Sequence, residues 1–136
     1  MPIAYRNGYK YQLVSDYAIA TGFAPGGYHA LPLAAIDPIG TLIIKAGYAW
    51  DGPSGPVPDV PEAMRGSLIH DCLYEFMRVG GLDRSWKPYA DKLLYKLCVE
   101  DGMNEIFART ILEGVTLFGE PFTEPNHENP VITVGS

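Results

Sequence analysis

Short runs that contain Tyr, Ile, Val and Thr occur over residues 1–50, and Gly, Pro and Asp break them at short intervals. Residues 9–13 alternate apolar and polar side chains, and residues 17–21 form a second strand-like run, so the pattern predicts a β-hairpin. The sequence Asp-Pro-Ile-Gly at residues 37–40 predicts a turn between two further strands. We therefore expect a small antiparallel sheet in this part of the chain.

Proline and glycine dominate residues 51–60, which read DGPSGPVPDV. This composition continues neither a central strand nor a helix, and it predicts a rigid loop. At the end of the loop Asp59 is placed to cap a helix that begins near Pro61, with Glu62 reaching back as in a capping box.

From residue 61 onward apolar residues recur at helical spacing. The pattern predicts one helix that ends at Gly80, a second over residues 88–100, and a third that Asn104 caps and that continues to Gly119. The expected fold class is α+β, with a small N-terminal antiparallel β-sheet followed by three helices.

The domain organisation follows from the length of 136 residues, which is enough for one hydrophobic core. We expect a single α+β domain over residues 1–119, with its strand-rich part at 1–50, its loop at 51–60 and its helical part at 61–119. Residues 120–136 are polar and rich in proline, and they are expected to form an extended C-terminal arm. The strand-like run at residues 131–134 would let this arm pair with another chain or with a second copy.

Composition and charge narrow the functional classes. A formal net charge of −6 gives no basic field, so nucleic acid is not an expected partner. No apolar run approaches the roughly 20 residues of a membrane span, and no signal peptide is evident, so we expect a protein that stays inside the cell that makes it. Cys72 and Cys98 are expected to be buried thiols.

The segment HDCLY is the strongest candidate for chemistry. Tyr74 lies four residues after His70 and shares its helical face, as does Ser67 three residues before it. His70 lies in an otherwise apolar turn, and its burial predicts a lowered pKa and a neutral imidazole, as a general base requires. Asp91 follows 21 residues later on the expected antiparallel helix, where it can meet and orient the histidine.

Two further carboxylates predict a metal site. Asp71 points off the same helical turn as His70, and Asp51 lies in the upstream loop. Carboxylate oxygens suit a divalent cation, with Ca²⁺ preferred on ligand type, Mg²⁺ or Mn²⁺ as alternatives, and Zn²⁺ or Fe if His70 is a direct ligand.

Each of these features also has a purely structural interpretation. A His-Asp dipeptide is common, Asp91 can simply stabilise the start of the second helix, and Asp51 with Gly52 can be a turn. A satisfied network of buried polar groups would demand the same residues as a catalytic site.

Three motifs in order, AGYAWDGPSGP, LIHDCLYE and YADKLL, resemble a family of uncharacterised small phage and prophage proteins. Their shared pattern is an Asp-Gly-x-Ser loop, a His-Asp-x-Leu-Tyr helix and an Ala-Asp helix, and it covers about residues 41–119. Gly55 departs from the hydrophobic residue usual in that loop. The resemblance implies a viral gene product made in the host cytoplasm, with incorporation into the virion as a further expectation, and it implies no activity.

The helical residues also resemble the site of the secreted phospholipases A2, especially the compact microbial type. That resemblance implies that His70 is the base, Asp71 a calcium ligand, Tyr74 the helix tyrosine and Asp91 the orienting acid, with Asp51 in the calcium loop. Those enzymes are secreted and disulfide-bonded, whereas this chain has two cysteines and a strand-rich front half.

Two functions follow as the main expectations. The first is a metal-assisted hydrolase acting on ester or amide bonds of lipid or cell-envelope material. The second is a non-enzymatic component of a phage tail, baseplate or connector, with other phage proteins or a second copy bound through the arm. A soluble module that binds a host protein is a third, with no motif behind it.

Overall fold

The computed structural model describes residues 3, 5–6, 11–53 and 57–124, and it confirms the α+β class. The strands are β1 (Tyr5–Arg6), β2 (Tyr11–Leu13), β3 (Tyr17–Ala20), β4 (His29–Leu31), β5 (Ala34–Ile36), β6 (Thr41–Ile44) and β7 (Ala49–Trp50). The helices are α1 (Met64–Val79), α2 (Lys87–Glu100) and α3 (Glu105–Phe118), with short 3-10 helices η1 (Pro61–Ala63), η2 (Arg84–Trp86) and η3 (Glu120–Thr123).

The strands form two antiparallel sheets rather than one, in the orders β1-β2-β7 and β3-β6-β5-β4. The expected hairpin between residues 9–13 and 17–21 is wrong, because β2 pairs with β7 and β3 pairs with β6. Tyr11 faces Trp50, and Tyr17 faces Ile44. The step of six residues is the same on both sides, so the two pairings have the same antiparallel register. The chain therefore continues from β2 into β3, and the later segment runs back beside both strands.

The predicted turn at residues 37–40 is confirmed between β5 and β6. The Asp37 side chain accepts hydrogen bonds from the backbone of Ile39 and Thr41, and Gly40 has a positive φ of 95°. A Cβ at Gly40 would lie 1.9 Å from the carbonyl oxygen of Phe23, so only glycine fits there.

The helix limits agree closely with the pattern. Gly80 ends α1, and the Asn104 side chain caps α3 by accepting from the backbone of Ile106 and Phe107. The expected cap at Asp59 is wrong: Val60 precedes η1 without a side-chain cap, and the Asp59 carboxylate instead accepts a hydrogen bond from the Tyr11 hydroxyl at 3.4 Å. The side chain of Asp59 therefore connects the loop to β2 and does not cap the helix.

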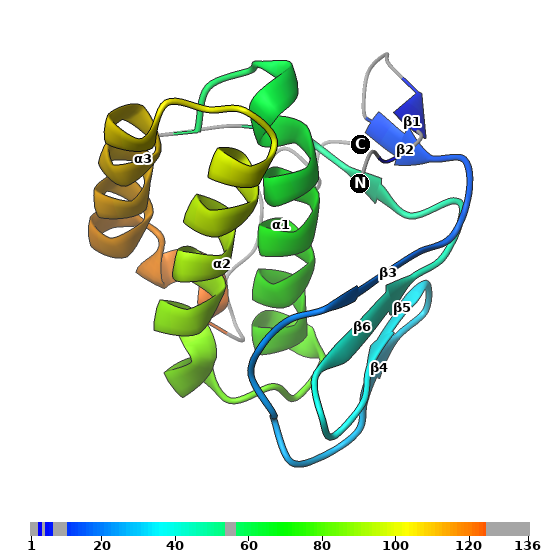
Figure 1. Ribbon diagram of the computed structural model, residues 1–136. Coiled ribbons are helices and arrows are strands. Elements are labelled where there is room, and N and C mark those ends of the chain that lie inside the picture. The colour runs from blue at the N-terminus through cyan, green and yellow to red at the C-terminus, as the bar shows by residue number, and fades with distance from the viewer. Residues whose placement is uncertain (1–2, 4, 7–10, 54–56, 125–136) are drawn as a thin grey trace.

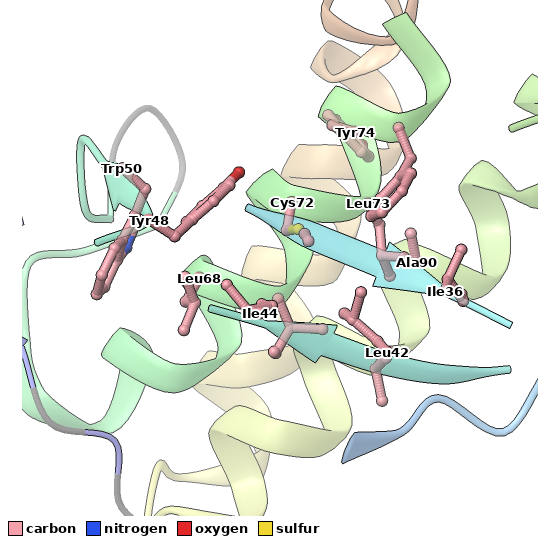
Figure 2. Packing of buried hydrophobic residues seen from close by; sticks show 14 of the residues in the cluster. Ile36, Leu42, Ile44, Tyr48, Trp50, Leu68, Cys72, Leu73, Tyr74 and Ala90 are labelled. Atoms are coloured by element: carbon pink, nitrogen blue, oxygen red, sulfur yellow. The ribbon is translucent and has the colours of Figure 1, made fainter. Parts of the chain in front are cut away.

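The three helices stand side by side, with α1 nearest the sheets, α2 in the middle and α3 at the outer edge (Figure 1). Leu42 and Ile44 of β6 and Ile36 of β5 pack with Leu68 and Leu73 of α1 in the larger hydrophobic cluster (Figure 2). A smaller cluster, which includes Leu94, Cys98, Ala108, Ile111 and Val115, fills the space between α2 and α3. Cys72 and Cys98 are free and buried, as expected.

The first residues of the expected arm are folded, since η3 packs on α1 and α3 and Thr123 is buried. The remaining residues 125–136, with the strand-like run at 131–134, lie outside the described residues. None of the helices in the described ranges is long and apolar enough to cross a bilayer.

Candidate functional site

The candidate site lies where α1 and α2 pack against each other. Gly66 allows the close approach of the two helices, because a Cβ there would lie 2.9 Å from a methyl carbon of Leu94 and 3.3 Å from Cys98 Sγ. The helices run in opposite directions (Figure 1), so His70 in the first half of α1 comes beside Asp91 near the start of α2.

His70 and Asp91 are in direct contact, as their spacing in the sequence predicted. Nε2 of His70 lies 2.7 Å from Oδ1 of Asp91, and both side chains are buried. A contact this short is typical of a charge-assisted hydrogen bond. It fixes the imidazole ring and favours the tautomer with its proton on Nε2.

Tyr74 completes the predicted group. Its hydroxyl donates to the same oxygen, Asp91 Oδ1, at 2.6 Å, and its ring lies 4.1 Å from the His70 ring between centroids. The helical spacing that placed Tyr74 on the face of His70 therefore also directs both side chains to one carboxylate oxygen.

Lys87 is a member of the site that sequence reasoning missed. Its ammonium group is buried and donates to Asp91 Oδ2 at 2.7 Å and to the carbonyl oxygens of Val115 and Thr116 in the last turn of α3. The signal was present as the four-residue spacing from Lys87 to Asp91 on one helix. The neighbouring α3 backbone, which holds the lysine in place, left no signal in the sequence.

The other nitrogen of His70 faces a different environment. Nδ1 lies 3.9 Å from Oδ1 of Asp71, which is too long for a direct hydrogen bond, and it forms no hydrogen bond with any described residue. The Asp71 side chain is 39% exposed, compared with 6% for His70. Nε2 is therefore engaged with the buried carboxylate of Asp91, whereas Nδ1 lies on the side of the partly exposed carboxylate of Asp71.

The charge state of His70 differs from the expectation. Burial acts to lower the pKa of His70, but the carboxylates of Asp71 and Asp91 together outweigh it and hold the pKa above its usual value. The predicted lowering is therefore wrong in its net direction, because it considered burial alone and not the balance between burial and two neighbouring carboxylates.

Asp91 responds in the opposite direction. Burial acts to raise the pKa of Asp91, and the hydrogen bonds from His70, Lys87 and Tyr74 outweigh it and lower the pKa. Asp91 therefore stays ionised beside the imidazole, as an orienting acid must.

Asp71 and Asp51 lie close enough for their charges to repel each other. The partial burial of its carboxyl group first, and the negative charge of Asp51 in addition, raise the pKa of Asp71, while His70 opposes them. The structure therefore brings the loop acid into electrostatic range of the helix acid. Across residues 3, 5–6, 11–53 and 57–124, however, no three His, Cys, Asp or Glu side chains form a group that could hold a metal ion.

Ser67 shares the helical face of His70 and is committed to structural contacts. Its hydroxyl accepts from Trp50 Nε1 at 3.1 Å and donates to the carbonyl oxygen of Met64 at 2.9 Å. Neither of these two hydrogen bonds involves His70.

Comparison with known protein families, with curated proteins and with solved structures found no match to this chain. The chemistry of the site consequently rests on its geometry. A buried, oriented imidazole with an ionised acid on one nitrogen and an unbonded second nitrogen can accept a proton from water.

Proposed function

We propose that this protein is a hydrolase in which His70 acts as a general base on water. The observation that carries the proposal is the difference between the two ring nitrogens. Nε2 is fixed to Asp91 at 2.7 Å, whereas Nδ1 forms no hydrogen bond with any residue that the structure describes and has only a longer ion-pair contact, 3.9 Å, with Asp71 Oδ1. A purely structural histidine is expected to use both nitrogens, because buried polar groups are usually satisfied.

The proposed reaction has two proton transfers. Nδ1 accepts a proton from water while the water oxygen bonds to the carbonyl carbon of an ester or amide, and the imidazolium then gives this proton to the departing oxygen or nitrogen. Asp91 remains ionised and stabilises the imidazolium through Nε2–H, while Tyr74 and Lys87 hold its two oxygens. The expected substrates are esters or amides of lipid or cell-envelope material.

A divalent cation fits this proposal as a partner of Asp71 and Asp51. Two carboxylates that repel each other are suited to a hard cation whose other ligands are water and substrate oxygens. Ca²⁺ remains our preferred ion, with Mg²⁺ and Mn²⁺ as alternatives. Zn²⁺ or Fe would require His70 as a ligand, which would remove the base. When bound, such an ion would polarise the substrate carbonyl.

A substrate screen with matched histidine variants tests the proposal. The wild-type protein is assayed with ester, phosphodiester and peptidoglycan substrates with and without Ca²⁺, and His70→Ala should lower any hydrolysis by about 10²- to 10⁴-fold. His29→Ala is the control, because His29 lies on β4 outside the site, and it should retain the wild-type rate. Unchanged turnover by His70→Ala, or no turnover by the wild-type protein on any substrate, would contradict the proposal.

The cation is tested separately by Asp71→Asn. We expect this change to remove the stimulation of hydrolysis by Ca²⁺ and to leave the circular dichroism spectrum unchanged. Equal stimulation in the variant and in the wild-type protein would rule out Asp71 as a ligand.

One observation favours a second candidate, a non-enzymatic component of a phage particle. Lys87 joins Asp91 to the last turn of α3, so the network connects all three helices in a way that a structural role also requires. In that case the protein would be made in the host cytoplasm and assembled into the virion through residues 125–136. Deletion of those residues from the phage gene should then block particle assembly, and normal assembly would contradict this candidate.

A further inference from the structure

An apolar face that no described element covers runs along α3. Four large side chains on this helix are well exposed, namely Ile106 at 78%, Phe107 at 47%, Leu117 at 71% and Phe118 at 68%. With about 100° of rotation per residue, these four residues, with Thr110 and Gly114 between them, fall within one third of the helix circumference. We call these six residues the α3 apolar face.

The position of α3 explains why nothing in the described fold covers this face. The helix stands at the outer edge of the helical layer (Figure 1), and its main contacts with described elements are to α2 and η3. Ala108, Ile111 and Val115 are buried and form the inward side of the helix, which adjoins the α3 apolar face next to Phe118. A patch of four large apolar side chains on one short helix is unusual for a surface that faces only water.

The pattern of the α3 apolar face is self-complementary. Large residues lie at both ends, Ile106 and Phe107 at one and Leu117 and Phe118 at the other, and the small residues Thr110 and Gly114 lie between them. In an antiparallel pair of α3 helices, Ile106 and Phe107 of one helix come within about one turn of Leu117 and Phe118 of the other helix. The small residues at the centre let the two helix axes approach closely.

Charged residues along one edge of the face fit the same arrangement. Glu105, Arg109 and Glu113 follow each other at four-residue spacing, and Arg109 lies 3.4 Å from Glu105 within its own helix. With a two-fold axis level with residue 111, Arg109 of one copy lies level with Glu113 of the second copy, because the two residues are equally far from the axis along the helix. The symmetry repeats this pairing, so the dimer gains two ion pairs across its edge.

We infer that the α3 apolar face is a homodimer interface in which two α3 helices pack antiparallel about a two-fold axis near residue 111. A specific interface buries at least about 1,000 Å² in total, and eight large side chains that are each 47% to 78% exposed provide an area of this order. A membrane surface fits less well, because helices that bind lipid carry Lys and Arg on their polar side, whereas this edge has two Glu for one Arg and the chain carries a charge of −6.

Sedimentation equilibrium of the full chain tests the inference, because it measures the molar mass in solution. The salt concentration is about 0.15 M, at which screening limits the repulsion between two acidic copies. The wild-type protein should be a dimer, and Leu117→Glu should raise its dissociation constant at least about 100-fold, because each dimer buries the new charge twice. Ile39→Glu is the control: Ile39 is also 78% exposed, but it lies in the β5–β6 turn and should leave the dimer intact.

A charge exchange tests the antiparallel register. Arg109→Glu and Glu113→Arg should each weaken the dimer about tenfold, and the two changes together should restore it. Failure of the double variant to recover would overturn the proposed register. A wild-type protein that is monomeric at every concentration, or that floats with neutral lipid vesicles as a monomer, would overturn the interface itself.

Discussion

Two buried polar clusters join α1 to α2, and they are built in different ways. At one end Arg65 donates to Asp101, Glu100 and Tyr17, so its guanidinium is held on every side. Further along α1, His70 uses one nitrogen on Asp91 and leaves the second without a hydrogen bond in the described structure. The Arg65 cluster contains a cation of fixed charge, whereas the His70 cluster contains a titratable imidazole whose pKa is raised by two neighbouring carboxylates.

The Arg65 cluster has the features of a structural connection, whereas the His70 cluster also has those of a site for proton transfer. Both clusters hold the same two helices, so both should contribute to stability. Only the His70 cluster combines an oriented titratable base, an ionised partner and a nearby partly exposed carboxylate. We therefore expect substitutions in the two clusters to resemble each other in their effect on folding and to differ in their effect on hydrolysis.

The largest effect on stability should come from Asp91→Ala. This change leaves the Lys87 ammonium buried without its carboxylate, and removal of one partner from a buried ion pair should cost about 4 kcal/mol. Urea unfolding measures the loss. In the double variant Lys87→Met, Asp91→Ala, part of the loss should be recovered, because the unpaired charge is gone. A loss below about 1 kcal/mol for Asp91→Ala would show that the network is not a major source of stability.

Arg65→Met should have the next largest effect, a loss of about 3 kcal/mol in the free energy of unfolding. The effect is smaller because its partners Asp101 and Glu100 are 22% and 47% exposed and can be solvated by water. Under conditions where the variant is folded, its hydrolytic rate should equal that of the wild-type protein. A rate that falls as far as in His70→Ala would remove the distinction between the two clusters.

Tyr74→Phe should cost about 1.5 kcal/mol, because Asp91 loses one hydrogen bond to its charged oxygen. The pKa of Asp91 should rise, since the Tyr74 hydroxyl is one of the donors that lower it. Tyr89→Phe is the matched control on α2, where the tyrosine is 52% exposed, and it should be nearly neutral. Equal unfolding curves for Tyr74→Phe and Tyr89→Phe would contradict a contribution from this contact.

The smallest effect is the dependence of stability on pH through His70. Its pKa in the folded protein lies above the ordinary value of 6.5, so the stabilisation by its charged form is complete below pH 6.5 and is lost as the pH rises through the folded pKa. Hydrolysis should change in the opposite sense and increase with pH, because the base must be neutral. Urea unfolding of the wild-type protein and of His70→Asn at pH 6 and pH 9 measures the first effect, and parallel profiles would contradict it.

The sequence predicted the helical part of the molecule more closely than the sheets. Helical spacing with Gly80 and Asn104 at the ends located α1 and α3, and the same spacing placed Tyr74 beside His70. The pairing of strands depends on contacts distant in the chain. The short segment between residues 13 and 17 gave no indication that β2 and β3 would both pair with the segment around residues 41–50.

The site was likewise predictable only where helical spacing and the antiparallel arrangement of α1 and α2 determine its contacts. The spacing of His70 and Asp91 on antiparallel helices predicted their contact, which the structure confirms at 2.7 Å. The role of Lys87 depends on carbonyl groups of α3, and the raised pKa of His70 depends on the joint effect of two carboxylates. Such balances between burial and neighbouring charge require coordinates.

The tautomer of His70 tests the central claim most directly, because a general base needs a free electron pair on Nδ1. The ¹⁵N spectrum of the imidazole, recorded at a pH above the His70 pKa, distinguishes the two neutral forms without any substrate. We expect the proton on Nε2, where it is donated to Asp91, and an unprotonated Nδ1. A proton on Nδ1 would contradict the account, because that nitrogen would then be a donor beside Asp71 and could not accept a proton from water.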